Sequence, residues 1–109
     1  MTVKELSRLT DFSEIILSDP DRDIDGAYVG DLLSWVMGRA QSGNAWITIM
    51  SNVNVLAVAT LADVSCVILA EGVELDGEVL AVAREKEINV LSTGLAMYEA
   101  SLRLAEALR

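Results

Sequence analysis

The chain has 109 residues, which fits one domain that buries roughly 65% of the surface its unfolded form exposes. It carries 17 acidic and eight basic residues, for a net charge of −9, and the basic residues are scattered along the sequence. Because phosphate backbones and anionic lipids repel such a chain, nucleic-acid binding and binding to anionic membranes are disfavoured.

The apolar fraction of 52% and the mean hydropathy of +0.40 are high for so small a protein. This surplus indicates burial against a partner, most simply a second copy of the chain. We expect no secretory signal, since no basic segment precedes an apolar core, and the uncharged run from Ala40 to Ala62 is too polar for a membrane span. Cys66, the single cysteine, fits an inert core position in a reducing compartment, so we expect a cytoplasmic protein.

The first third of the chain predicts a short helix, a strand and an acidic loop. Thr2 and Glu5 have the spacing of a capping box, which predicts a helix over roughly Val3 to Leu9. A strand is expected from Phe12 to Leu17, before Pro20. The acidic segment that follows predicts a loop that passes into a short extended piece at 27–29.

The next helix is expected from about Leu32 to Arg39. Asp31 stands where a carboxylate can accept hydrogen bonds from first-turn amides and complement the helix dipole. The apolar face of this helix is assigned to Leu32, Leu33, Trp35 and Val36.

Three short apolar runs, Ala45 to Ile49, Ser65 to Ala70 and Ile88 to Ser92, alternate with helical patterns. Continuous apolar runs of this length are typical of strands buried on both faces of a parallel sheet. The sequence therefore predicts an α/β fold, a mostly parallel sheet with flanking helices, in a single small domain over residues 1–109.

Three helices are expected around these strands. Asn52 is placed to cap a helix over Val53 to Ala62, which holds no charged residue and must be covered on more than one side, for instance at a subunit interface. A helix over about Gly77 to Glu87 is amphipathic. The last helix, about Leu95 to Leu108, is expected to pack through Leu95, Tyr98, Leu102 and Ala105.

The alternation of Asp21, Asp23 and Asp25 reproduces the first half of a calcium-binding EF-hand loop, with Gly26 at the turn. The second half does not match, because Leu32 stands where a bidentate glutamate is required. We therefore interpret the segment as a solvated acidic loop, with an irregular calcium loop as the alternative, and expect no metal or other cofactor.

The candidate ligand-binding site follows from the fold. Ligands of parallel sheets bind beyond the carboxyl ends of the strands, where loops and helix N-termini present free amides. Short polar residues and glycines at these ends suit a small polar ligand, although the same residue types are also ordinary helix caps. The candidate residues are Asp31, Ser51, Asn52, Asn54, Glu71, Gly72, Ser92 and Thr93.

The sequence offers little for catalysis. It has no histidine, no nucleophile motif and no Cys/His metal cluster, and its loops match neither phosphate-binding glycine motif. No catalytic residue is assigned. Trp35 and Trp46 are interpreted as core residues and not as a platform for stacking bases.

The order of elements from Trp46 to Ala100 resembles the DRTGG domain. The stretch from Tyr28 to Ser34, together with Asn54 and residues 57–59, is similar to the small stand-alone members of that family in anaerobic and thermophilic bacteria. Of the residues that name the family, only Gly72 is retained where the motif belongs. The motifs that carry the resemblance are Ser51-Asn52, Val67-Ile68-Leu69, Gly72-Val73-Glu74, Ile88 to Thr93, and Tyr98.

The resemblance implies an α/β domain similar to the N-terminal domain of HPr kinase. Such domains accompany phosphotransacetylase and CBS-containing pyrophosphatase as regulatory or dimer-forming parts. We therefore expect a non-catalytic, homodimeric regulatory module that binds a small polar or anionic metabolite at the strand ends and works with a bacterial signalling or metabolic partner protein. The alternative is an enzyme or accessory subunit in a bacterial phosphoryl-transfer system.

Overall fold

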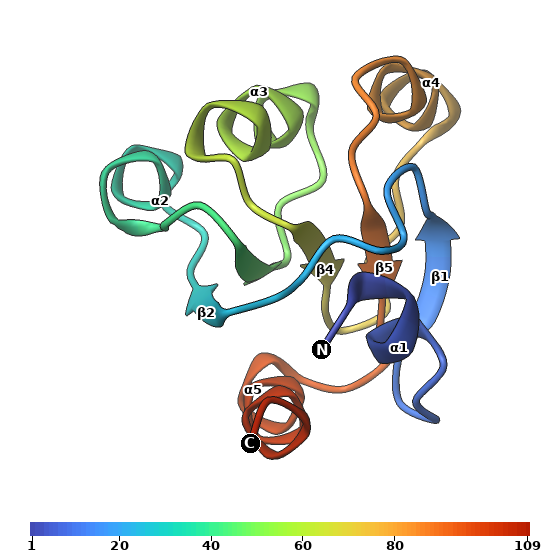
Figure 1. Cartoon of the computed structure of the whole chain (residues 1–109). Helices are drawn as coiled ribbons and strands as arrows, with labels where there is room; N and C mark the ends of the chain where they lie inside the picture. The colour runs from blue at the N-terminus through green and yellow to red at the C-terminus, as the bar shows by residue number, and fades with distance from the viewer.

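A computed structural model describes all residues from 1 to 109 and shows three layers. A five-stranded sheet lies between helices α2, α3 and α4 on one face and helices α1 and α5 on the other (Figure 1). The expected α/β fold with a mostly parallel sheet and flanking helices is confirmed. The strands are β1 (Ser13–Ile16), β2 (Gly26–Val29), β3 (Asn44–Thr48), β4 (Cys66–Leu69) and β5 (Val90–Ser92).

The strands lie in the order β1-β5-β4-β3-β2. The four strands from β2 to β5 are parallel, and β1 pairs antiparallel with β5, with Ser13 opposite Ser92. Every residue of β3 and β4 is buried, as the continuous apolar runs predict. The extended piece predicted at 27–29 is the parallel edge strand β2.

The helices are α1 (Val3–Ser7), α2 (Leu33–Arg39), α3 (Val53–Ala62), α4 (Gly77–Glu85) and α5 (Met97–Ala107). The predicted capping box at α1 is present, with Thr2 and Glu5 bonded to each other's amides. Asn52 caps α3 as predicted, since its side chain accepts a hydrogen bond from the Asn54 amide at 2.9 Å. Both caps need only residues within one turn, which is why the sequence specifies them.

The core has two halves, one on each face of the sheet. Trp46 is fully buried in the half beneath α2, α3 and α4. Cys66 lies in the half beneath α1 and α5, where burial raises the pKa of its thiol to about 12. This confirms Trp46 and Cys66 as core residues.

Helix α2 differs from the prediction in its cap and its apolar face. Its N-cap is Leu32, and no side chain caps it, because the Asp31 carboxylate bonds elsewhere. Only Val36 is fully buried. Trp35 is 52% exposed and its ring lies 3.8 Å from the Arg39 guanidinium carbon, so the core assignment of Trp35 is wrong.

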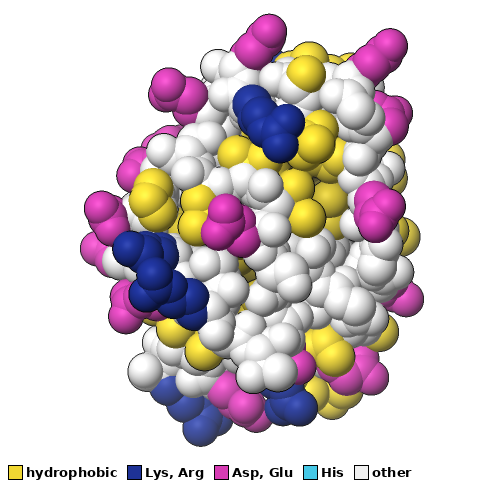
Figure 2. Space-filling model, turned by 90° about the vertical axis from the view of Figure 1, so that its right-hand side faces the viewer, with side chains coloured by type: hydrophobic (Ala, Val, Ile, Leu, Met, Phe, Trp, Pro, Cys, Tyr) yellow, Lys and Arg dark blue, Asp and Glu magenta, His cyan; other side chains and the backbone are white.

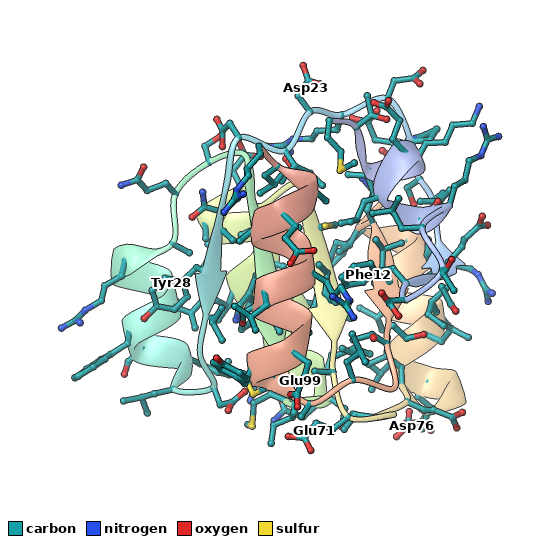
Figure 3. The ribbon with its side chains drawn as sticks, turned by 90° about the horizontal axis from the view of Figure 1, so that it is seen from below. Phe12, Asp23, Tyr28, Glu71, Asp76 and Glu99 are labelled. Atoms are coloured by element: carbon teal, nitrogen blue, oxygen red, sulfur yellow. The ribbon has the colours of Figure 1, made fainter.

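Helix α5 packs through a different face from the predicted one. Its fully buried residues are Ala100 and Leu104, whereas Tyr98 is 72% and Leu102 is 45% exposed. The small side chain of Ala100, which is buried, lets the helix approach the sheet closely. Figure 3 shows α5 lying over the sheet.

Helix α3 is covered by the sheet beneath it and by its neighbours α2 and α4, yet part of it stays exposed. Val53 and Leu61 are exposed and Ala57 lies between them on the same stripe, since the three are spaced four residues apart. None of the helices is both long enough and apolar enough to cross a membrane.

Candidate functional site

A pocket of about 280 Å³ lies where β4 and β5 end. This is the edge of the sheet at which the sequence places a ligand. Five of its ten lining residues are hydrophobic. The lining residues are Ile15, Leu69, Gly72, Val73, Glu74, Leu75, Leu80, Ser92, Thr93 and Gly94.

Two loops that follow neighbouring strands form one wall of the pocket and are joined by backbone hydrogen bonds. The Glu71 amide donates to the Leu95 carbonyl at 2.8 Å, and the Gly72 amide donates to the Thr93 carbonyl at 3.0 Å. Glu71 and Gly72 both have positive φ, at 58° and 72°, which turns the first loop sharply after β4. The wall is therefore held in place without a ligand.

The second loop supplies the pocket's hydroxyl groups. Thr93 is buried, and its Oγ1 accepts a hydrogen bond from the Leu95 amide at 3.1 Å. Ser92 is half-buried at the last position of β5. Thr93 thus shapes the loop, and Ser92 adds a second hydroxyl-bearing residue to the lining.

Apolar side chains from three elements form the rest of the pocket. Ile15 comes from β1, Leu69 from the end of β4, and Leu80 from α4. Figure 2 shows the side of the molecule that carries β1 and α4, with apolar side chains gathered in its upper half and charged side chains around them. The pocket therefore combines an apolar floor with a polar rim.

Glu74 is the one charged residue that lines the pocket. Asp76, two residues later, caps α4, and its Oδ1 accepts a hydrogen bond from the Val79 amide at 3.1 Å. Figure 3 places Glu71 and Asp76 at the same end of the molecule, far from Asp23. The loop between β4 and α4 carries three carboxylates and no basic residue, so this end of the molecule is acidic.

Three of the predicted site residues, Gly72, Ser92 and Thr93, line the pocket. Glu71 stands beside them in the loop, with its side chain exposed. The ends of β4 and β5 therefore bring half of the predicted residues together.

The other predicted residues belong to the ends of β2 and β3 and do not line the pocket. Oδ1 of Asp31 accepts hydrogen bonds from the Thr48 hydroxyl at 2.7 Å and from the Ile49 amide at 2.9 Å, which joins the loop after β2 to the end of β3. Asn52 caps α3, and Ser51 and Asn54 flank it. Asn52 therefore acts as a helix cap, and Asp31 fastens the loop after β2 to the end of β3.

The carboxylates of the acidic segment do not lie together in the structure. Asp23 pairs with Thr2 in an isolated β-bridge, and the Asp25 carboxylate lies against Gly43. Asp21, like Asp23 and Asp25, is exposed. The structure brings no three acidic or other metal-ligating side chains together anywhere in the chain, so the carboxylates do not converge on one point.

A smaller hollow of about 140 Å³ lies at the opposite ends of the strands. Several of its polar groups have partners within the protein. Arg22 forms a hydrogen-bonded ion pair with the Asp63 carboxylate at 2.9 Å, and the Ser42 hydroxyl donates a second hydrogen bond to the same carboxylate. Together these two hydrogen bonds lower the pKa of the Asp63 carboxyl. The amide group of Asn89 bonds to Asp19 and Ser65. These contacts fasten the acidic loop to the sheet.

Sequence reasoning missed the apolar part of the pocket and its carboxylate. Val73, Glu74 and Leu75 directly follow the predicted Gly72, so the whole loop up to α4 could have been included. The position of Ile15 at the pocket could not be predicted in this way, because β1 reaches the site by antiparallel pairing with β5, which is distant in sequence.

A solved structure resembles this fold. It contains the CBS and DRTGG domains of the regulatory region of Clostridium perfringens pyrophosphatase in complex with the activator diadenosine tetraphosphate. The two chains align with a TM-score of 0.64 and 17% sequence identity, over 83% of this chain and 40% of that one. No curated protein matches the chain in sequence.

The sequence profile described as the DRTGG domain matches residues 26–107. The match includes every lining residue of the pocket except Ile15, which lies on β1 before it. The resemblance found in the sequence is therefore confirmed at the level of the family: the chain belongs to the DRTGG domain family.

Proposed function

We propose that the protein is a non-catalytic regulatory module that binds a small polar molecule in the pocket at the ends of β4 and β5. The observation that carries this proposal is the pocket itself, whose wall is made by two loops bonded to each other at Glu71 and Gly72. A preformed wall lowers the entropic cost of ordering the site when a ligand binds.

Family membership and the solved neighbour support a regulatory role. The neighbour is a regulatory region that holds a nucleotide activator. This chain spans 40% of the neighbour's length, so binding of a small effector by this chain is part of our proposal. The same proposal includes a finer likeness to the stand-alone bacterial members of the family and to the N-terminal domain of HPr kinase. It also includes a cytoplasmic location and action on a bacterial signalling or metabolic partner protein.

The binding proposal is tested by a thermal-shift screen of nucleotides, phosphorylated metabolites, amines and sugars. A ligand present at a hundredfold excess over its Kd should stabilise the folded protein by about 2.7 kcal/mol. The variant Ser92→Val, which replaces the pocket's half-buried hydroxyl, should lose the shift. Ser18→Val changes an exposed residue outside the pocket and should keep it. If no compound raises Tm, or if both variants respond alike, the pocket is not the binding site.

We further propose that the protein is a homodimer joined through the exposed stripe of α3, which consists of Val53, Ala57 and Leu61. Leu61 is 70% exposed, and Trp35 on the neighbouring α2 is 52% exposed. Helix α3 has no charged residue in a chain with a net charge of −9. Two copies therefore repel each other least where these stripes meet, and they bury apolar surface there.

The dimer is tested by sedimentation of the wild type and of Leu61→Lys at micromolar concentration. A lysine in the stripe should shift the protein to monomer, because the interface would bury an unpaired charge. Ala81→Lys adds the same charge at an exposed position of α4 and should leave the dimer intact. A monomeric wild type, or equal behaviour of the two variants, would contradict this proposal.

A further inference from the structure

We infer that the pocket at the ends of β4 and β5 selects a small organic cation, a ligand with an apolar body and an ammonium group, over anions. This inference rests on the proposed function, because it names the ligand class of the same pocket. It is narrower than the sequence-based expectation of a polar or anionic metabolite.

The lining of the pocket carries a negative charge. Glu74 is the one ionisable residue among the ten lining residues, and at neutral pH it places a negative charge at the pocket. An ammonium group bound beside this carboxylate gains an ion pair, whereas a phosphate or carboxylate group meets a like charge.

Basic residues are absent from the chain segments that carry most of the lining. No Lys or Arg occurs between residues 40 and 83 or between residues 87 and 102, and these ranges contain nine of the ten lining residues. Arg84, one helical turn after Leu80, is the basic residue nearest in sequence to the part of α4 that lines the pocket, but it does not line the pocket itself.

Apolar side chains make up half of the pocket's lining. Leu69, Leu75 and Leu80 form an apolar floor within a volume of about 280 Å³, which is sufficient for a ring-sized apolar body. Ser92 adds a hydroxyl at the edge of this floor, where it can accept a hydrogen bond from an ammonium group. An apolar body with a cationic head satisfies the floor, the hydroxyl and the carboxylate together.

The inference is tested with three probes that share one apolar body. Cyclohexylmethylammonium, cyclohexylmethanol and cyclohexanecarboxylate are titrated at pH 7 and low ionic strength, and the backbone amide shifts of Gly72, Ser92 and Gly94 are followed by NMR. Inorganic phosphate is a fourth probe. The ammonium should bind about threefold tighter than the alcohol, in keeping with an exposed ion pair, and the carboxylate and phosphate should bind more weakly than the alcohol.

Variants identify the group responsible. Glu74→Gln should abolish the preference for the ammonium over the alcohol. Glu85→Gln removes an exposed carboxylate of α4 that does not line the pocket, and it should leave the preference unchanged. Arg84→Gln should also leave the order of the probes unchanged.

The inference would be overturned if the ammonium probe left the three amides unshifted, or if the carboxylate or phosphate bound at least as tightly as the ammonium. It would also be overturned if the preference for the ammonium over the alcohol survived Glu74→Gln. The proposed function fails by a different result, when no compound of any charge in the thermal-shift screen stabilises the protein. An anion that stabilises the protein through this pocket would reject the inference and leave the proposed function standing.

Discussion

Asp31 is a residue whose role depends on a contact that is distant in sequence. Its position before α2 is that of a helix cap, yet its carboxylate accepts hydrogen bonds from Thr48 and Ile49 at the end of β3. Thr48 is fully buried, so its hydroxyl relies on this acceptor. One carboxylate thus fixes the loop after β2 to the neighbouring strand.

Replacement of this carboxylate should destabilise the fold. In Asp31→Ala the Thr48 hydroxyl and the Ile49 amide lose their acceptor, which should lower the free energy of unfolding by about 1–3 kcal/mol. Thermal unfolding should show a Tm decrease of about 4 °C or more for a chain of this size. Asp21→Ala removes an exposed carboxylate that has no hydrogen-bond partner and serves as the control; equal Tm values for the two variants would contradict the assigned role.

Asp63 and Glu87 both have positive φ, although neither is a glycine. Glu87 follows α4 with φ of 57°, a conformation that costs a residue with a side chain about 1–2 kcal/mol relative to glycine. Glu87→Gly should therefore stabilise the protein by about 0.5–1 kcal/mol, after the greater backbone entropy of glycine in the unfolded chain is subtracted. Denaturant unfolding measures this change.

Asp63 is the matched comparison, because it ends α3 with the same φ of 57°. Its carboxylate also bonds to Arg22 and Ser42, and Asp63→Gly removes these contacts together with the strain. Asp63→Gly should consequently raise the free energy of unfolding by less than Glu87→Gly does. A larger gain at Asp63 would show that these two contacts contribute nothing to stability.

For the helices and strands, the sequence predicts that an element exists and where it lies better than it predicts which face the element buries. Helix α3 begins and ends at the predicted residues, because Asn52 and Asp63 act on neighbouring amides and carbonyls. Helix α5 also lies where the pattern predicts it, but two stripes of its surface contain apolar residues. Which stripe meets the sheet depends on how closely the helix can approach, and sequence periodicity does not contain that information.

The orientation of α5 gives a prediction for packing. Ala100 is fully buried against the sheet, and Ala105 on the same helix is exposed. Ala100→Leu should cost about 1–3 kcal/mol, because the added atoms push the helix from the sheet. Ala105→Leu should change stability by no more than about 0.5 kcal/mol. Denaturant unfolding distinguishes the two, and the opposite order would support the face first predicted from Tyr98 and Leu102.

At the scale of the whole molecule, the order of the strands decides which predicted site residues meet. The sequence places polar residues after each parallel strand, and all of these strand ends lie at one edge of the sheet. The pocket forms only beside β4 and β5, where the antiparallel strand β1 adds Ile15. The sequence did not predict this pairing, so the site could be located to an edge of the sheet but not to one pair of loops.

The net charge of −9 leads to a prediction about the proposed dimer. Two acidic copies repel each other over their whole surfaces, while the uncharged stripe of α3 contributes an attraction that does not depend on salt. Since the screening length falls from about 30 Å at 0.01 M salt to about 8 Å at 0.15 M, added salt weakens the repulsion. The dimer Kd should therefore decrease by on the order of tenfold over this range.

Sedimentation equilibrium at several salt concentrations measures this dependence. The variant Glu78→Gln/Glu85→Gln removes two exposed charges of the neighbouring helix α4, outside the stripe, and should lower Kd at low salt more than at 0.15 M. An interface held by ion pairs gives the opposite result, because salt weakens such pairs. A dimer Kd that rises with salt would thus show that charged residues form the contact, and it would exclude the uncharged stripe of Val53, Ala57 and Leu61 as the main contact surface.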